Sequence, residues 1–151
     1  MRIYIDCEFN GLGGSLISMA LVTESGDEWY EVLELPEGET LDPWVAEHVM
    51  PLLGKEPISA DEFRAKLHSF LRQFDGCEVM GDWPADFEHL CSQMSFIGAD
   101  LGFWLPIECS MHLIKGSPEI KSKIPHHALS DARALRDWHQ STLMLRDDIY
   151  K

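Results

Sequence analysis

The chain has 151 residues, a formal net charge of −14 and a hydrophobic content of 45%. A chain of this length and hydrophobic content can form one domain with its own core, so we expect residues 1–151 to fold as a single domain. So negative a chain repels nucleic acid on average, and any nucleic-acid binding must therefore depend on bound metal ions and a local basic patch. The apolar runs are too short to span a membrane, and the N-terminus lacks the basic region and apolar core of a secretion signal, which favours a cytoplasmic protein without membrane contact.

The first predicted strand covers residues 2–9, where side chains alternate between two faces. One face carries Ile3, Ile5, Cys7 and Phe9, and the other carries Tyr4, Asp6 and Glu8. Asp6 and Glu8 therefore lie roughly 6–7 Å apart on one face, although both residue types are poor strand formers. The pair fits either a solvent-facing edge strand or a divalent-metal site, because Mg²⁺ and Mn²⁺ prefer oxygen ligands.

Two more strands follow, over residues 15–23 and 28–35, with hairpin-turn residues at 24–27 between them. The first of the two is continuously apolar and reads as buried, while the second alternates and reads as half-exposed. Three consecutive strands with tight links predict an antiparallel meander.

The chain then becomes helical. Asp42 followed by Pro43 is typical of a helix start, and that helix must end or kink before Pro51. Ser59 begins a second helix, which ends by Gly76.

Strands and helices alternate after this point. Short strands are expected at residues 77–80 and 105–109, and a third helix follows Asp82, which we interpret as a helix cap. A loop over 112–125 leads to a last helix over about 128–146. The whole order, β-β-β-α-α-β-α-β-α, predicts an α/β protein with a mixed sheet and helices on its faces, an architecture that resembles the ribonuclease H-like fold.

The four cysteines lie far apart and form no C-x-x-C pair. Each of them, Cys7, Cys77, Cys91 and Cys109, falls in an apolar segment. This pattern predicts reduced core thiols in preference to disulfides or a zinc site.

Two helical aspartates lie where a charge is costly. Asp131 begins the apolar stripe of the last helix, which continues through Leu135, Trp138, Thr142 and Leu145. A carboxylate there costs several kcal/mol unless it is paired with a cation or bound to a metal. Asp86 has a similar place in the first turn of the third helix.

His126 lies five residues before Asp131 and directly after Pro125. On a continuous helix this spacing would turn the two side chains apart by about 140°. Because proline favours a loop here, His126 is expected to precede the helix and to reach the carboxylates from there. Beside clustered carboxylates, a histidine is a candidate general base.

Together these residues resemble the DEDD 3′–5′ exonucleases, in the subtype with a histidine in the third motif. Asp6-Cys7-Glu8 is similar to the first motif, Asp86 to the second-motif aspartate, and His126 with Asp131 to the third motif, His-x-x-x-x-Asp. The motifs come in family order and span most of the chain. Within the family, the chain most resembles the compact bacterial 3′–5′ exoribonucleases, including a segment with Trp44 and His48, which we take as packing residues.

The resemblance implies hydrolysis with two Mg²⁺ or Mn²⁺ ions at the 3′ end of single-stranded RNA or a short overhang, which releases nucleoside 5′-monophosphates. It implies that Asp6 bridges both ions, that Glu8 and Asp131 hold the first, and that Asp86 supports the second. It also implies that His126 takes the proton of the attacking water. Whether the chain forms a homodimer stays open.

Substrate contacts are expected from two places. Phe9 or Leu12, beside the first motif, is expected to wedge against a terminal base. Lys115, Lys121 and Lys123 form a locally positive loop before the third motif, with Glu119 as the one acid between residues 112 and 127. This loop fits either phosphate contact or a solvated surface loop.

Two other readings of the same residues stay open. The chain fits a 3′–5′ exonuclease that acts on DNA, and it also fits a non-catalytic metal-binding or protein-docking module on the same fold. Against the second reading, all five residues of the catalytic type are present.

Overall fold

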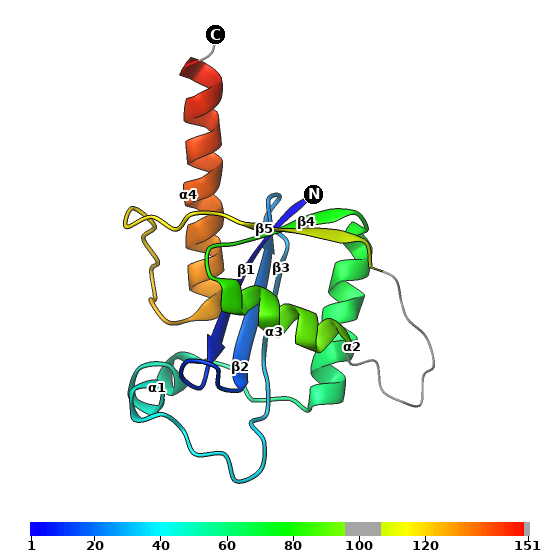
Figure 1. The fold of residues 1–151 in the computed structure, drawn as a ribbon, viewed down its shortest axis with the longest axis vertical. Coiled ribbons are helices and arrows are strands. Elements are labelled where there is room, and N and C mark those ends of the chain that lie inside the picture. The colour runs from blue at the N-terminus through cyan, green and yellow to red at the C-terminus, as the bar shows by residue number, and fades with distance from the viewer. Residues whose placement is uncertain (96–106, 150–151) are drawn as a thin grey trace.

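The computed structural model describes residues 1–95 and 107–149, and in this part of the chain a five-stranded mixed sheet carries helices on its faces (Figure 1). The strands are β1 (Arg2–Phe9), β2 (Leu16–Thr23), β3 (Glu28–Val32), β4 (Cys77–Gly81) and β5 (Cys109–Leu113), in the order β3-β2-β1-β4-β5. β1, β2 and β3 pair in antiparallel fashion, whereas β4 is parallel to β1 and β5 is parallel to β4. The predicted meander and the α/β class are confirmed.

The helices of the described chain are α1 (Pro43–His48), α2 (Ala60–Leu71), α3 (Pro84–Ser95) and α4 (Ala128–Ile149). Short 3-10 turns follow α1 at Met50–Leu52 and α2 at Arg72–Phe74. The Asp42 carboxylate accepts a hydrogen bond of 2.8 Å from the Trp44 amide, and the Ser59 hydroxyl accepts one of 3.3 Å from the Glu62 amide. Both predicted helix starts are therefore confirmed, because each cap satisfies an amide that lacks a partner within the helix.

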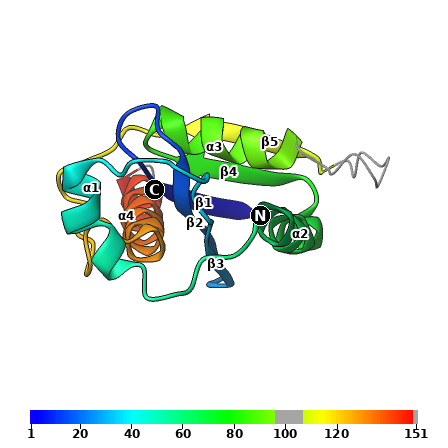
Figure 2. The same ribbon diagram turned by 90° about the horizontal axis from the view of Figure 1, so that it is seen from below.

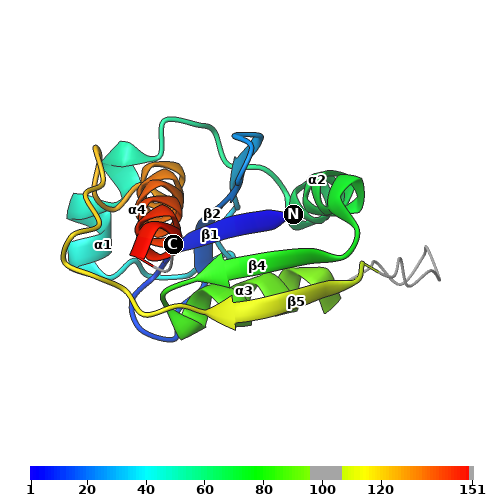
Figure 3. The ribbon, with the colours of Figure 1, turned by 90° about the horizontal axis from the view of Figure 1, so that it is seen from above.

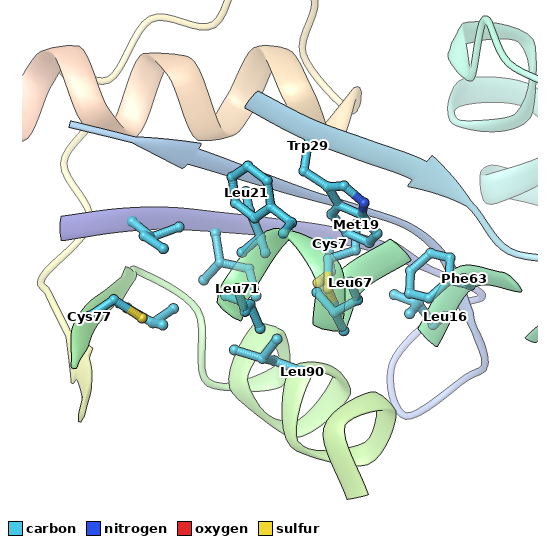
Figure 4. Packing of buried hydrophobic residues seen from close by; sticks show 14 residues of the cluster. Cys7, Leu16, Met19, Leu21, Trp29, Phe63, Leu67, Leu71, Cys77 and Leu90 are labelled. Carbon is cyan, nitrogen blue, oxygen red and sulfur yellow. The ribbon is translucent and has the colours of Figure 1, made fainter. Parts of the chain in front are cut away.

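Helices cover both faces of the sheet. α2 and α3 lie on one face, and α4 lies across β1 and β2 on the other (Figures 2 and 3). On the first face, Ile3 and Ile5 of β1 pack with apolar side chains of both helices; Figure 4 shows this cluster, which includes Cys7, Leu21, Phe63, Leu67, Leu71 and Leu90. On the second face, Tyr4 packs against Leu135. The predicted alternation along β1 is confirmed, and it puts Asp6 and Glu8 on the α4 side.

The fifth strand was predicted at the wrong residues. β5 begins at Cys109 and includes His112, which the sequence assigned to a loop, while residues 105 and 106 lie outside the described chain. The reason is its place at the edge of the sheet, where only β4 pairs with it. All of β5 except Cys109 is exposed, so no alternation of buried and exposed residues marks it in the sequence.

The inward stripe of α4 is also shorter than predicted. Leu135 is buried at 2% exposure, but Leu145 is 66% exposed. The C-terminal part of α4 extends beyond the sheet, as Figure 1 shows, so nothing of the sheet lies there for it to pack against.

The four cysteines are free, as predicted, and Cys7 and Cys77 are buried. Cys91 is exposed, so the prediction that every cysteine lies in the core is wrong for this residue. None of the helices in residues 1–95 and 107–149 is both long and apolar enough to cross a membrane.

Candidate functional site

The predicted site residues meet at one edge of the sheet. β1, β4 and β5 are parallel, so their C-terminal ends lie at the same edge. Asp6 and Glu8 lie in the C-terminal half of β1, and Asp82 follows the last residue of β4. In open α/β sheets this edge is where ligands bind.

The first group of carboxylates joins β1 to α4. Asp6, Glu8 and Asp131 each offer an oxygen, and these oxygens all lie within 4.8 Å of one another. Asp131 lies in the first turn of α4, which packs on the same face of β1 that carries the other two. The structure therefore brings together the residues that resemble the first and third motifs.

The second group joins β1 to the start of α3. Oxygens of Asp6, Asp82 and Asp86 also lie within 4.8 Å of one another, so Asp6 belongs to both groups. The approach of α3 to β1 depends on Gly81, where a Cβ atom would lie 2.9 Å from Cζ of Phe87 and 3.0 Å from Cγ2 of Ile5. Asp86 is only 2% exposed.

The prediction that Asp82 caps this helix is wrong. α3 begins at Pro84, so the residue directly before the helix is Trp83. Asp82 lies one residue earlier, and its carboxylate lies with those of Asp6 and Asp86.

The surroundings of these carboxylates raise their pKa values, so the charged forms are disfavoured. Burial, followed by the charges of Asp86 and Glu8, raises the pKa of Asp6 well above its usual value. Burial and the charge of Asp131 raise the pKa of Glu8 to about 7. Burial and the charge of Asp82 raise the pKa of Asp86 to about 8. Clustered acids with raised pKa values are characteristic of functional sites.

Within the described residues, no lysine or arginine forms an ion pair with any of these carboxylates. In the same part of the chain, Oδ2 of Asp86 and Oδ1 of Asp131 are buried and have no hydrogen-bond partner. A buried carboxylate oxygen without a partner is costly. Two groups of carboxylate oxygens that share Asp6 match the hard oxygen ligands that Mg²⁺ and Mn²⁺ prefer.

His126 lies beside Asp131 of the first group. As predicted, it precedes the helix, and its backbone adopts a φ of 64°. Its amide donates a hydrogen bond of 2.9 Å to Oδ2 of Asp131, and its ring meets Trp44 edge-on at 4.9 Å. The ring of the neighbouring His127 lies against Tyr30 at 4.9 Å, and its Nδ1 accepts a hydrogen bond of 3.4 Å from the Ser130 amide.

An apolar cavity of about 430 Å³ opens beside Glu8. Phe9, Leu12, Trp44 and Trp83 are among the side chains that line it. Leu12 is 91% exposed and also lines a second cavity of about 660 Å³, so its side chain borders both cavities.

Trp44 and His48 are not packing residues, so that interpretation is wrong. Trp44 is 48% exposed, and the exposed His48 stacks on its ring at 4.7 Å. The residues of α1 and its end that enter the core are Val45 and Val49. The helical spacing of the segment does not show which of its sides faces the core.

The lysine loop divides into two parts. Lys121 and Lys123 line a cavity of about 410 Å³ beside α4, together with His127, Arg133 and Arg136. The acids in this lining are Glu28 and Asp137, so basic side chains outnumber them. Lys115 lies at the other end of the loop, next to Gly116, which approaches Asp82.

Sequence reasoning missed two parts of this site. Asp82 was assigned to the helix, although its position directly after β4 was a usable signal. Trp83 carries no motif, and its place beside Glu8 in the lining of the apolar cavity comes from the fold alone.

No protein-family model matches this chain. The chain is similar to two proteins of Mycobacterium tuberculosis, from strains CDC 1551 / Oshkosh and ATCC 25618 / H37Rv, which are both named 3′-5′ exoribonuclease. Each is 33% identical to this chain over 98 residues, which amounts to 60% of this chain and 58% of the relative. The match thus spans little more than half the length of each relative.

Proposed function

We propose that this chain is a 3′–5′ exoribonuclease that uses two divalent metal ions on a ribonuclease H-like domain. The observation that carries the proposal is the position of Asp6, whose carboxylate lies within 4.8 Å of two separate groups of acids. Two adjacent ions that share one carboxylate are a known arrangement for phosphodiester hydrolysis. The names of the two mycobacterial relatives support the same activity.

In this proposal the two carboxylate groups hold one ion each. Asp6 would contribute an oxygen to both sites, Glu8 and Asp131 would complete the first, and Asp86 would contribute to the second. The partnerless oxygens of Asp86 and Asp131 support these roles, because an ion would supply the partner that each lacks. When bound, two such ions stabilise the charge on the attacking and leaving oxygens of the phosphoryl group.

His126 acts as the general base. It takes a proton from water while the water oxygen forms a bond to the terminal phosphorus. The bond between that phosphorus and the 3′-oxygen of the preceding nucleotide breaks, and this oxygen gains a proton. The products are a nucleoside 5′-monophosphate and a chain with a new 3′-hydroxyl.

The terminal nucleotide occupies the apolar cavity beside Glu8. The Trp44 ring and the side chains of Phe9 and Leu12 offer surfaces for a base, and base–aromatic stacking contributes about 1–3 kcal/mol per base. Leu12 separates the last base from the one before it, as its exposed position between two cavities suggests.

The upstream phosphates follow the basic cavity beside α4. Lys121 and Lys123 supply positive charge there, whereas Arg133 and Arg136 of α4 are ion-paired with Glu28 and Asp137 of the same lining. In a chain with a net charge of −14, such a local surface is what nucleic-acid binding requires. Lys115 is positioned to contact the phosphate nearest the second group of carboxylates.

The proposal is tested with a matched panel of 5′-labelled single- and double-stranded RNA and DNA in Mg²⁺ or Mn²⁺. We expect stepwise shortening from the 3′ end of single-stranded RNA, no activity in excess chelator, and none in Asp6→Ala. Asp61→Ala is the matched control, because that carboxylate is 92% exposed on α2. Activity that persists in chelator or in Asp6→Ala contradicts the two-ion mechanism, and preferential shortening of DNA contradicts the RNA substrate.

A further inference from the structure

Asp82 is the one acid of the site that the motifs do not account for. Its carboxylate oxygen lies within 4.8 Å of those of Asp6 and Asp86. It directly follows Gly81, the last residue of β4, at the edge of the sheet where ligands bind in open α/β sheets. Its position before Trp83 excludes it from the cap position of α3.

The surroundings of Asp82 keep its carboxylate in this place. A Cβ atom on Gly116 would lie 2.9 Å from Oδ2 of Asp82, so the backbone after β5 lies directly against the carboxylate. Among the ion pairs of the described residues, none involves Asp82. A carboxylate held against two others without a cation needs a compensating positive charge.

The neighbour that Asp82 faces gives an independent sign of a ligand. Asp86 is only 2% exposed, and its Oδ2 has no hydrogen-bond partner in the described chain. A buried oxygen of this kind usually has a hydrogen bond or a metal ion as its partner. The three oxygens of this group thus surround a position suited to a cation.

We propose that Asp82 is a direct ligand of the second divalent ion, so that this ion is held by Asp6, Asp82 and Asp86. The inference rests on the proposed function of the site and extends it from four carboxylates to five. Mg²⁺ and Mn²⁺ prefer carboxylate and water oxygens, so water or substrate oxygens would complete the coordination beside these carboxylates. The second site would then bind its ion before the substrate arrives.

Calorimetric titration of the full chain with Mn²⁺ tests this inference without any measurement of activity. The wild-type protein should bind two ions. Asp82→Asn, which keeps the shape of the side chain, should bind the first ion as before and the second at least about tenfold more weakly. Asp86→Asn should have a similar effect, and Asp61→Asn should have none. Retention of the first ion shows that each variant is folded.

The outcomes separate the two proposals. If Asp82→Asn binds both ions with wild-type affinity, Asp82 is not a ligand, whereas the proposed function stands. If the wild-type protein binds no ion, the proposed function fails, and the inference fails with it.

A cysteine variant tests direct contact. Asp82→Cys should weaken the second Mn²⁺ site but bind Cd²⁺ tightly, because a thiolate prefers a softer cation. The control is Asp61→Cys, which adds a thiol away from the site. It is needed because the exposed thiol of Cys91 is present in every variant and can bind Cd²⁺ itself. Tighter Cd²⁺ binding in Asp82→Cys than in the control supports a ligand role, and equal binding in the two variants contradicts it.

Discussion

The backbone amide of His126 donates a hydrogen bond of 2.9 Å to Oδ2 of Asp131. This bond connects the proposed general base to a proposed metal ligand at the start of α4. It also accompanies a φ of 64° at His126, a conformation that costs on the order of 1–3 kcal/mol for a residue with a side chain. Because one oxygen of Asp131 is taken by the amide, the other, Oδ1, is the oxygen left for an ion.

The first prediction concerns stability without metal. The pKa of Asp86 is about 8 in the folded protein against 3.8 in an unfolded chain, and that of Glu8 is about 7 against 4.5. Between these values the folded state binds more protons than the unfolded state. The free energy of unfolding should therefore fall as pH rises from about 4 to about 8, by up to about 1.4 kcal/mol per pH unit for each proton.

Denaturant unfolding in chelator at several pH values checks this prediction. Asp86→Asn should flatten the profile, because the amide does not titrate, and Asp61→Asn should leave it unchanged. Saturating Mn²⁺ should stabilise the protein more at about pH 8 than at about pH 6, since an ion must displace the bound protons. A metal-free protein whose stability rises over this range contradicts the electrostatic description.

The second prediction concerns the basic cavity. Replacing Lys121 and Lys123 together with alanine should raise KM for RNA and change kcat less, since the reacting groups lie elsewhere. The logarithmic salt dependence of binding should become shallower by about 0.7 for each lost phosphate contact. Lys115→Ala reports separately on the other end of the loop.

The exposed Arg72, at the end of α2, provides the control for a general loss of positive charge. Arg72→Ala should leave the salt dependence as it is in the wild type. An unchanged salt dependence in the double lysine variant would mean that the loop is only a solvated surface.

The third prediction concerns the apolar cavity. Trp44→Ala should raise KM by about 5- to 150-fold, because one base–aromatic stack is worth about 1–3 kcal/mol. Trp44→Phe keeps an aromatic ring beside His126 and should recover much of this loss. Steady-state kinetics on a short RNA measures both, with Leu113→Ala on the exposed edge strand as the control. An unaltered KM in Trp44→Ala would exclude this ring from the nucleotide site.

Local chemistry explains what the sequence predicted well. Asp42 and Ser59 identify helix starts because their side chains satisfy free amides nearby in the chain. The alternation of β1 identifies the face of Asp6 and Glu8 because one face is buried against α2 and α3. The carboxylates could be grouped in advance because their motifs follow a known order.

The features that sequence reasoning missed depend on distant parts of the chain. β5 is defined by backbone pairing with β4, which exposed side chains do not reveal. Whether Trp44 faces the core or the solvent depends on how α1 packs against Ile17 and Val32. The position of Asp82 depends on the helix beginning at Pro84, one residue later than a cap at Asp82 would require.

The last prediction identifies which of two adjacent histidines acts as the base. The backbone amide of His126 binds Asp131, whereas the ring of His127 lies against Tyr30 and accepts from the Ser130 amide. His126→Ala should therefore lose about 10²–10⁴-fold in turnover while it still binds two Mn²⁺ ions.

His126→Asn makes the test sharper, because asparagine tolerates the positive φ better than alanine and so keeps the backbone amide in place on Asp131. A loss of turnover in both variants then reflects the missing imidazole and not a displaced Asp131. His127→Ala should cost little beyond local stability, since its ring packs against Tyr30. Single-turnover cleavage of a labelled RNA measures all three variants. A large loss in His127→Ala, with near-normal turnover in His126→Asn, would assign the base to His127 and move the third motif by one residue.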